Sequence, residues 1–305
     1  MTATGNHAMS DIVRLAMTTR AETFERIREP LADRGVEVGH VRVKERSFRV
    51  AGGHDTSDRA AAPAFDVGFV YPSRIMEGAA VDTRLSIPWV NGRDAVLASR
   101  NKAGVLATLD AAGLPVPRTT LVSNPVDESV VVDAVRGFEF PVIVKPNSAT
   151  RGVGVAKAMD LDSLLGVVDY LNLVHDYRAT GDKSYLIQEF LPNARDYRAM
   201  VVDGEYAGAV RRALSTEALA AGRWKHNVHR GAEATGVDLH AEGRALAERT
   251  AAALDIDYLG VDLLETDDRL VVNETNARPT VDAATKYEPG FYDRLAALIE
   301  RVAEA

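Results

Sequence analysis

The chain has 305 residues, 46% of them hydrophobic and 26% charged, which is the balance of a globular protein with two or three packed domains. It contains no cysteine, which excludes disulfides, thiolate metal sites and cysteine nucleophiles. Its formal net charge of −8 argues against non-specific binding to nucleic acid or an anionic membrane. Because no apolar run is long enough to span a bilayer and no secretory signal opens the chain, we expect a cytoplasmic protein with a flexible tail at residues 1–10.

The first part of the chain alternates between strand and helix patterns. The predicted strands cover residues 11–19, 36–43 and 65–73, and the sequence between the first two predicts an amphipathic helix over residues 20–35. Strand–helix–strand order with short glycine stops is typical of a parallel sheet. Residues 11–92 therefore predict a small N-terminal α/β domain.

The second part, residues 93–183, begins with a pattern that predicts one long helix over residues 93–112. The elements that we expect after it are strands at 118–123 and 140–146, helices at 125–137 and 160–174, and a glycine-rich loop at 148–155 that leads into another strand. We interpret this segment as a central domain whose glycine loop lies between two strands.

The third part, residues 184–305, predicts a strand at 184–191 and two hairpins at 197–212 and 258–276. The first hairpin turns on Asp203-Gly204, one of the strongest short hairpin signals. Helices are expected at residues 240–254 and at the C-terminus. The fold class that we predict for the whole chain is α/β, with α+β lobes after the N-terminal domain.

The last hairpin ends in polar residues at alternate positions, Glu274, Asn276 and Arg278, which share a face if the strand continues. A turn at residues 267–269 would place Asp262 directly opposite Glu274. Two carboxylates about 5 Å apart repel by roughly 3 kcal/mol at an effective dielectric of about 20, so a positive charge must offset them. A solvent-exposed acidic hairpin is the ordinary alternative. Because both carboxylates lie among apolar residues, we favour a Mg²⁺ site of Asp262, Glu274 and Asn276.

A buried strand ends at Lys145, and Gly152 and Gly154 follow it in the glycine loop. Glycines let backbone N–H groups approach phosphate oxygens closely, and a lysine at a strand end adds a fixed positive charge. The loop lacks the Gly-Lys-Ser/Thr of a Walker A motif and the spacing of a dinucleotide fingerprint. The alternative is a plain hairpin turn, but the combination suits a triphosphate.

Other polar residues are ambiguous when each is taken alone. Lys102 could bind phosphate or lie on a solvated helix surface, and Glu189 could accept from a ribose or adenine or lie at a strand edge. Asp196 and Arg198 share one face of a strand. A loop near residue 227 is rich in basic residues, and in an acidic protein such a loop more often binds an anion than arises by chance. Its residues are Lys225, Asn227, His229 and Arg230.

The order of these motifs resembles the ATP-grasp superfamily, and within it the RimK-like amino-acid (α-L-glutamate) ligases. The resemblance covers about residues 93–305 and rests on nine short motifs in order: Lys102 before GLPVPRT, PVIVKP, the glycine loop, LIQEFL, RDYR, AVRR, NVHRGA, GVDLL and NETNARP. It implies an N-terminal pre-ATP-grasp domain at residues 11–92, a central ATP-grasp lobe at 93–183 and a C-terminal lobe with the metal site at 184–305. It also implies ATP with one or two Mg²⁺ or Mn²⁺ ions.

The resemblance also assigns roles to residues of this chain. The residues that it places at ATP are Lys102, Lys145, Gly152, Gly154, Gln188, Glu189, Phe190, Leu191, Asp196, Arg198, Lys225 and Asn227. Arg211, Arg212 and Arg230 would be catalytic and face the acyl phosphate, and His229 and Arg278 would bind substrate. Where relatives carry an arginine two residues before the loop asparagine, this chain has Lys225, a point charge rather than a bidentate fork.

The resulting prediction is a carboxylate–amine ligase that forms an amide bond through an acyl phosphate, using an amino acid such as L-glutamate and a carboxylate acceptor. The acceptor could be a small molecule or a protein, including a carrier protein of lysine or arginine biosynthesis. Two alternatives stay open: a nucleotide-binding module without ligase activity, and an enzyme that phosphorylates a substrate without amine transfer. Relatives often pair, so a homo-oligomer is possible, and we expect neither nucleic acid nor membrane as a partner.

Overall fold

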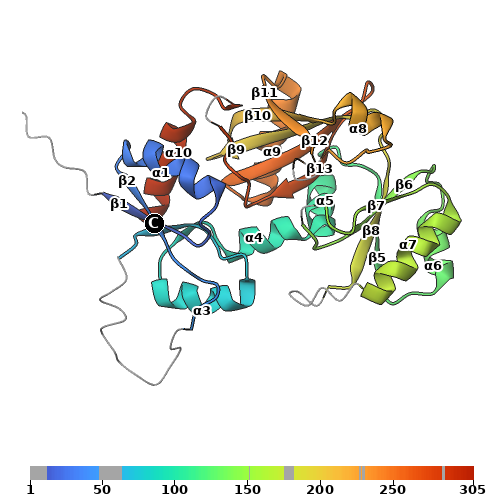
Figure 1. The fold of residues 1–305 in the computed structure, drawn as a ribbon, viewed down its shortest axis with the longest axis horizontal. Helices are drawn as coiled ribbons and strands as arrows, with labels where there is room; N and C mark the ends of the chain where they lie inside the picture. Colours follow the sequence, from blue (N-terminus) through green and yellow to red (C-terminus); the bar gives the residue numbers. More distant parts are fainter. Residues whose placement is uncertain are drawn as a thin grey trace, which may run out of the picture. The chain divides into compact units, whose positions relative to one another are not determined.

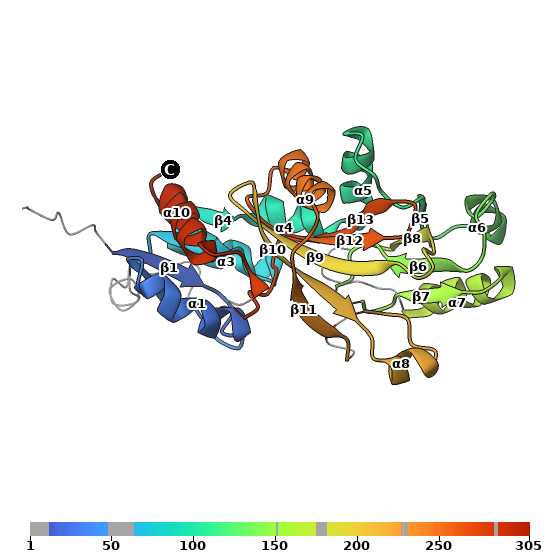
Figure 2. The ribbon, with the colours of Figure 1, turned by 90° about the horizontal axis from the view of Figure 1, so that it is seen from above.

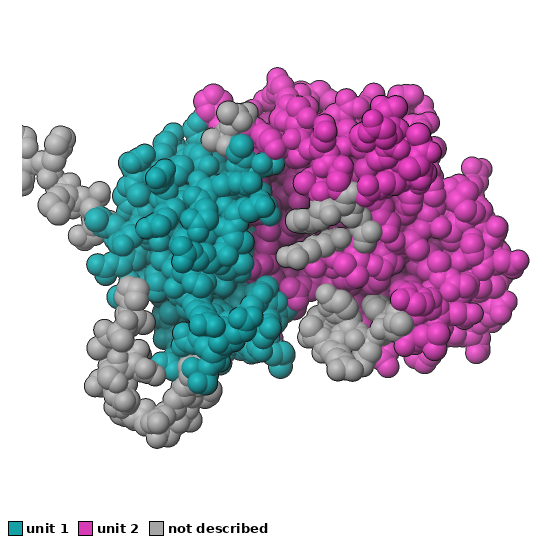
Figure 3. Space-filling view, viewed as in Figure 1, with its two compact units in different colours: residues 1–92, 280–283, 290–305 teal, residues 93–279, 284–289 magenta. Residues whose placement is uncertain are grey.

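The structure is a computed structural model that describes residues 12–47, 64–150, 152–174, 182–226, 228, 231–283 and 286–305. Its contacts divide the chain into two compact units, coloured separately in Figure 3. The first unit comprises residues 1–92, 280–283 and 290–305, and the second comprises 93–279 and 284–289. The division into an N-terminal domain and two lobes stays a prediction.

The first unit is built on a four-stranded sheet in which all neighbouring strands run parallel. In spatial order its strands are β2 (Val36–His40), β1 (Val13–Met17), β3 (Val67–Val70) and β4 (Trp89–Asn91). The helices of this unit are α1 (Glu22–Ala32), α3 (Ile75–Leu85) and α10 (Phe291–Ala303). Leu15 and Val67 are fully buried, as strands of a covered parallel sheet require. The predicted parallel α/β fold of this segment is confirmed.

The second unit contains two antiparallel sheets. In the four-stranded sheet the strands are, in spatial order, β5 (Thr119–Ser123), β8 (Ser184–Glu189), β6 (Val142–Pro146) and β7 (Ala156–Ala158). Two helices, α6 (Glu128–Ala134) and α7 (Leu161–Val174), pack against it (Figure 1). Their apolar side chains bury Val142, Val144 and Ile187 on one face, which leaves the ends of β6 and β8 free to carry polar groups.

The five-stranded sheet has the strand order β11 (Glu233–Val237), β10 (Glu205–Ala213), β9 (Arg195–Val202), β12 (Tyr258–Glu265) and β13 (Leu270–Asn276). Helix α9 (Ala241–Leu254) packs against β9, β10 and β12, and it lies beside α5 (Lys102–Ala111) in Figure 2. Helix α4 (Arg93–Arg100) precedes α5 and contacts β13. A short helix, α8 (Thr216–Ala220), follows β10. Among the described residues, no helix is long and apolar enough to cross a membrane.

The hairpin predicted at Asp203-Gly204 is confirmed, because Val202 pairs with Glu205 and both turn residues have positive φ, +55° and +77°. Positive φ at both central positions is the geometry of the turn that fits the twist of a hairpin. The sequence patterns did not indicate α3, α8 or β11, which are short or weakly patterned.

The single helix predicted over residues 93–112 is wrong. Asn101 has an extended backbone with ψ of 90°, and its side chain caps α5 by accepting from the backbone N–H of Gly104 at 3.0 Å. An asparagine that bonds the backbone ahead of it starts a new helix rather than continuing the old one. The break therefore places Lys102 in the first turn of α5, where its side chain is buried.

In the last hairpin, Asp262 pairs with Glu274 as predicted, but the loop and the strand register differ from the prediction. Its loop is longer than predicted, because Glu265 pairs with Leu270, and Thr266 and Arg269 bond each other across the loop. A β-bulge between Asp262 and Leu263 then shifts the register, so that Asp262 faces Glu274 as predicted. The longer loop and the bulge offset each other, and Asn273 is the additional residue on β13.

Candidate active site

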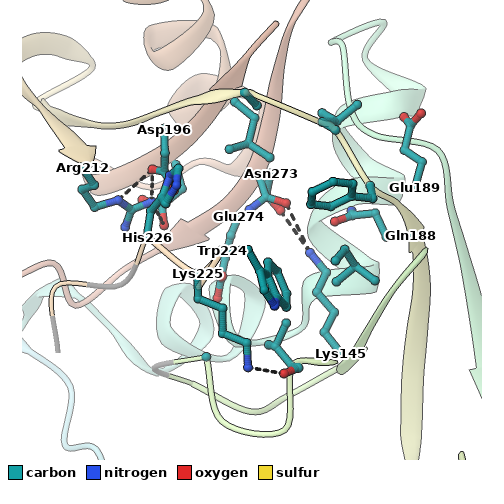
Figure 4. A pocket seen from close by; sticks show the side chains of 18 of the residues that line it. Lys145, Gln188, Glu189, Asp196, Arg212, Trp224, Lys225, His226, Asn273 and Glu274 are labelled. Carbon is teal, nitrogen blue, oxygen red and sulfur yellow. Dashed lines mark hydrogen bonds and ion pairs between the residues drawn. The ribbon is translucent and has the colours of Figure 1, made fainter. Parts of the chain in front are cut away.

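A cavity of about 290 Å³ lies within the second unit and is lined by residues of both of its sheets (Figure 4). One part of the lining is charged and comes from β6, β9, β10, β12 and β13. Another part is apolar and comes from the end of β8 and the segment after α8. The predicted residues in the lining are Lys145, Gly152, Gln188, Glu189, Phe190, Leu191, Asp196, Arg212, Lys225, Asp262 and Glu274.

Charged residues lie directly opposite one another on the strands of the five-stranded sheet beside this cavity. Arg198 on β9 pairs directly with Asp262 on β12, and Asp262 pairs with Glu274 on β13. On the other side of β9, Arg212 of β10 pairs with Asp196. Directly opposite residues of neighbouring strands share a face, so the sheet register itself gathers these side chains.

Asp262 is the centre of this row, with a side chain that is 8% exposed. Arg198 donates to both of its oxygens, from Nε to Oδ1 at 2.7 Å and from Nη2 to Oδ2 at 2.8 Å, and Arg212 lies 3.1 Å from Oδ2. Burial alone would raise the pKa of Asp262, but the two guanidinium groups outweigh it and hold that pKa below its usual value. Asp262 is therefore a carboxylate with two internal counter-ions.

Asp196 shares Arg212 with Asp262. Arg212 donates to Asp196 Oδ1 from Nε at 2.7 Å and from Nη2 at 2.5 Å, and His226 Nδ1 lies 3.8 Å from the other oxygen. Burial raises the pKa of Asp196, with Arg212 opposing the change and Asp262 adding to it. Burial also lowers the pKa of His226, as do the charges of Arg212 and Arg211. This end of the cavity therefore holds a compact group of interacting charges.

Lys145 brings a buried ammonium group to the middle of the cavity, as Figure 4 shows. Its Nζ lies 3.5 Å from both the backbone carbonyl and the side-chain oxygen of Asn273. Burial lowers the pKa of Lys145 to about 8, with Glu274 opposing and Lys102 adding to the effect. A buried cation with two long contacts to the neutral oxygens of Asn273 is well suited to an anionic ligand.

Lys102 is buried, which removes the alternative of a solvated helix residue. Its ammonium group donates to the backbone carbonyl of Ala149 in the glycine loop and lies 3.2 Å from Glu274 Oε1. Lys102 thus connects the start of the glycine loop to the carboxylate pair Asp262 and Glu274.

In the glycine loop, φ is positive at Gly152 (+65°) and Gly154 (+73°), a conformation that glycine adopts readily. A Cβ at Gly154 would lie 2.7 Å from Pro146 Cγ, so the loop needs glycine there. Lys225 donates to the carbonyl of Val155, which ties the segment after α8 to the end of the loop.

The apolar part of the cavity contains residues that the sequence interpretation missed. The indole of Trp224 meets the ring of Phe190 edge-on at 6.3 Å between centroids. The ammonium group of Lys157 lies 4.8 Å from the Phe190 centroid and 5.5 Å from that of Trp224. Trp224 directly precedes the basic loop, so its part in this aromatic group could have been predicted from the sequence. Asn273 could not, because it lies at the cavity as a result of the β-bulge.

Gln188 and Glu189 are occupied by protein partners. Gln188 donates to the hydroxyl of Thr119 at 2.9 Å. Glu189 accepts from the backbone N–H of Arg118 at 2.6 Å and from Arg269 Nη2 at 2.6 Å. The second bond joins the four-stranded sheet to the loop of the last hairpin.

Several predicted residues are described but do not line the cavity. Arg211 is exposed, since adjacent residues of a strand point to opposite faces and Arg212 points inward. Asn276 Oδ1 accepts from the backbone N–H of Arg278 at 2.8 Å, which turns the chain at the end of β13. Burial and the charge of Arg100 lower the pKa of Arg278 to about 10. Asn227, His229 and Arg230 lie outside the described residues.

The donors Asp262, Glu274 and Asn276 fit a hard divalent cation in their chemistry, since two opposed carboxylates and an amide supply oxygen ligands. In the part of the chain that the structure describes, no group of three or more His, Asp or Glu side chains gathers as a cation cage. A cation here would therefore complete its shell with other oxygens, such as those of phosphate or water.

Comparison with solved structures defines the class of fold. D-cycloserine synthetase DcsG superimposes with a TM-score of 0.70 at 20% identity, over 95% of this chain and 99% of that chain. The RimK domain ATP-grasp protein of Sphaerobacter thermophilus gives 0.65 at 24% identity, over 96% and 100%. D-alanine–D-alanine ligase of Bacillus anthracis gives 0.66 at 17% identity, over 96% and 97%. The fold is that of the ATP-grasp proteins, as the sequence predicts.

The sequence comparison identifies the family within that class. The profile of the RimK-like ATP-grasp domain matches residues 99–290, and the chain belongs to this family. A probable α-L-glutamate ligase of Klebsiella pneumoniae is 30% identical over 217 residues, 70% of this chain and 68% of that protein. The ribosomal protein bS6–L-glutamate ligase of Escherichia coli is 28% identical over 199 residues, 65% and 62%. A Shewanella halifaxensis relative is matched over 44% of its length. The family to which these proteins belong implies ATP and a divalent metal.

Proposed function

We propose that this protein is an ATP- and Mg²⁺-dependent carboxylate–amine ligase that forms an amide bond through an acyl phosphate. In this proposal it adds L-glutamate, or a similar amino acid, to a small-molecule or protein acceptor. The observation that carries the proposal is one cavity that combines a buried lysine, a glycine loop and an opposed carboxylate pair. The relatives named α-L-glutamate ligases support the choice of amino acid.

The proposed roles follow the charges in the cavity. Lys145 and Lys102 would stabilise the phosphates, and Gly152 and Gly154 would let the loop backbone approach them. The apolar part would hold the base, with contacts from Gln188, Glu189, Phe190 and Leu191. The remaining proposed contacts to nucleotide, acyl phosphate or substrate are Asp196, Arg198, Arg211, Arg212, Lys225, Asn227, His229, Arg230 and Arg278.

Asp262, Glu274 and Asn276 would hold the divalent metal. When bound, the metal would spread the negative charge of the transferring phosphoryl group. The chain itself contributes fixed positive charge on buried side chains, where each charge acts more strongly than in water. Transfer of a phosphoryl group to a carboxylate needs positioning and electrostatics rather than a protein nucleophile, which agrees with the absence of cysteine.

Lys225 supports the second half of the proposed reaction, the attack of an amine on the acyl phosphate. Its bond to the carbonyl of Val155 holds the glycine loop against the segment that carries Trp224. A loop held in this way would keep water from a reactive intermediate.

The test is ADP release with Mg-ATP across a matrix of amino acids and carboxylate acceptors, followed by mass spectrometry of the active mixtures. We expect ADP only where an acid and an amine are both present, and a product lighter than their sum by one water. ATP binding without acceptor-dependent ADP would instead favour a nucleotide-binding module. Phosphorylated acceptor without amide would favour a kinase.

A further inference from the structure

The opposed carboxylates Asp262 and Glu274 each hold a cationic side chain of this chain. Arg198 makes a bidentate bond to Asp262 at 2.7 and 2.8 Å, and Lys102 lies 3.2 Å from Glu274. Bidentate, charge-assisted pairs of this kind are the strong members of their class. Both oxygens of Asp262 thereby accept from guanidinium groups, so a divalent cation that binds this carboxylate competes with them for its lone pairs.

The charges of this cluster already balance. Its carboxylates are Asp196, Asp262 and Glu274, and its ion-paired cations are Arg198, Arg212 and Lys102. A divalent cation added to the cluster would create an excess of positive charge in a buried place, with Lys145 nearby as well. Like charges in such surroundings repel by several kcal/mol at an effective dielectric of about 20. The excess must be removed by displacing a side chain or by bringing an anion.

We infer that Arg198 is a positioning residue that acts as the exchangeable counter-ion of Asp262, sets the affinity of the cation site, and so couples metal binding to nucleotide binding. This inference rests on the proposed function, because it takes Asp262 as a metal ligand. Arg198 is suited to the exchange, since its side chain is 29% exposed whereas that of Arg212 is only 8% exposed. Arg212 stays with Asp196 and Asp262, while Arg198 can swing to a phosphate.

The inference predicts two states of one site. Without nucleotide, Arg198 holds Asp262 and the site binds a divalent cation weakly. With nucleotide bound, the phosphates offer Arg198 another partner and Asp262 becomes available to the cation. Nucleotide then raises the affinity of the protein for the cation, and the cation raises its affinity for nucleotide by the same factor.

The experiment measures Mn²⁺ binding by paramagnetic resonance of the free ion, at neutral pH, with and without a non-hydrolysable ATP analogue. The variant is Arg198→Met, which keeps the length of the side chain and removes its charge. We expect nucleotide-free Mn²⁺ affinity to rise by roughly tenfold or more, the effect of losing one charge-assisted bond, and the gain from the analogue to shrink. Arg198→Lys should lie between this variant and the unmodified protein.

The matched control is Arg195→Met on the same strand. Arg195 bonds Glu265 at 3.0 Å, away from the cluster, so Mn²⁺ affinity should change by less than about twofold. Circular dichroism and thermal melts establish that each variant is folded, and Arg198→Lys carries the test if Arg198→Met is not. Unchanged Mn²⁺ affinity in folded Arg198 variants overturns the inference. If Asp262→Asn then still weakens Mn²⁺ binding, the proposed metal site stands; if it does not, that assignment fails as well.

Discussion

Replacing Lys145 with alanine tests the proposed phosphate site most simply, because its ammonium group is buried and lies in the middle of the cavity. Burial lowers the pKa of Lys145 from 10.5 to about 8, so holding its charge costs the folded protein roughly 3 kcal/mol, at about 1.36 kcal/mol per pH unit. A phosphate oxygen about 4 Å away returns an energy of similar size, roughly 4 kcal/mol at an effective dielectric of about 20. We therefore expect Lys145→Ala to weaken ATP binding by roughly a hundredfold, or about 2.7 kcal/mol.

Calorimetric titration with a non-hydrolysable ATP analogue and Mg²⁺ measures this loss directly. The control is Lys183→Ala, which removes an exposed lysine next to β8 and should leave the affinity unchanged. Lys145→Ala should fold at least as stably as the unmodified protein, because it removes a desolvated charge. A folded Lys145→Ala variant that binds the analogue within about twofold of the original affinity would refute the assignment of Lys145 to the phosphates.

Three further predictions address the metal ligands, the pH dependence and the fold. Glu274→Gln should abolish Mg²⁺-dependent turnover while circular dichroism stays unchanged. The control, Glu300→Gln on the exposed side of α10, should keep both turnover and circular dichroism unchanged; normal turnover in Glu274→Gln would remove it from the metal site. ATP affinity should be constant below about pH 8 and fall by up to about tenfold per pH unit above it. The reason is that Lys145 loses its proton in this range in the free protein, whereas bound phosphate raises the pKa of Lys145. Lys145→Arg should flatten the profile, and a slope that persists in this variant would assign the pH dependence to another group. Gly208→Ala should lower the free energy of unfolding by roughly 2–4 kcal/mol in denaturant titrations, because φ is +133° there and a Cβ would lie 2.7 Å from the Cα of Tyr287. The control is Gly166→Ala in α7, which has open space around its Cβ position. Equal unfolding free energies for the two variants would contradict the predicted strain at Gly208.

Much of the fold followed from local patterns. The parallel sheet of the first unit, the Asp203-Gly204 hairpin and the antiparallel last hairpin all have periodicities and turn residues that act over a few positions. The break at Asn101 did not follow, because a capping asparagine and a solvated one look alike in sequence. The opposition of Asp262 and Glu274 was predicted correctly from a loop that was too short, since the bulge at Asn273 compensated for it.

The sequence also predicted a positive charge beside that carboxylate pair and assigned it to Mg²⁺, without indicating any side chain as its source. In the structure it comes from Arg198, Arg212 and Lys102, which lie on three separate elements. Their pairing depends on which strands become neighbours in the five-stranded sheet, and β10–β9–β12 adjacency is not a property of any short segment. Trp224 and Lys157 meet for the same reason, across two parts of the chain distant in sequence.

The most direct test of the central claim follows the oxygen atoms of the acceptor. Once an active acid–amine pair is known, the acceptor carboxylate is labelled with the heavy isotope of oxygen and the released phosphate is analysed by mass spectrometry. The account predicts one labelled oxygen in the phosphate for each amide formed, because the carboxylate attacks the γ-phosphoryl group and the amine later displaces phosphate with that oxygen. Unlabelled phosphate alongside amide product would contradict the acyl-phosphate route and with it the proposed role of this cavity.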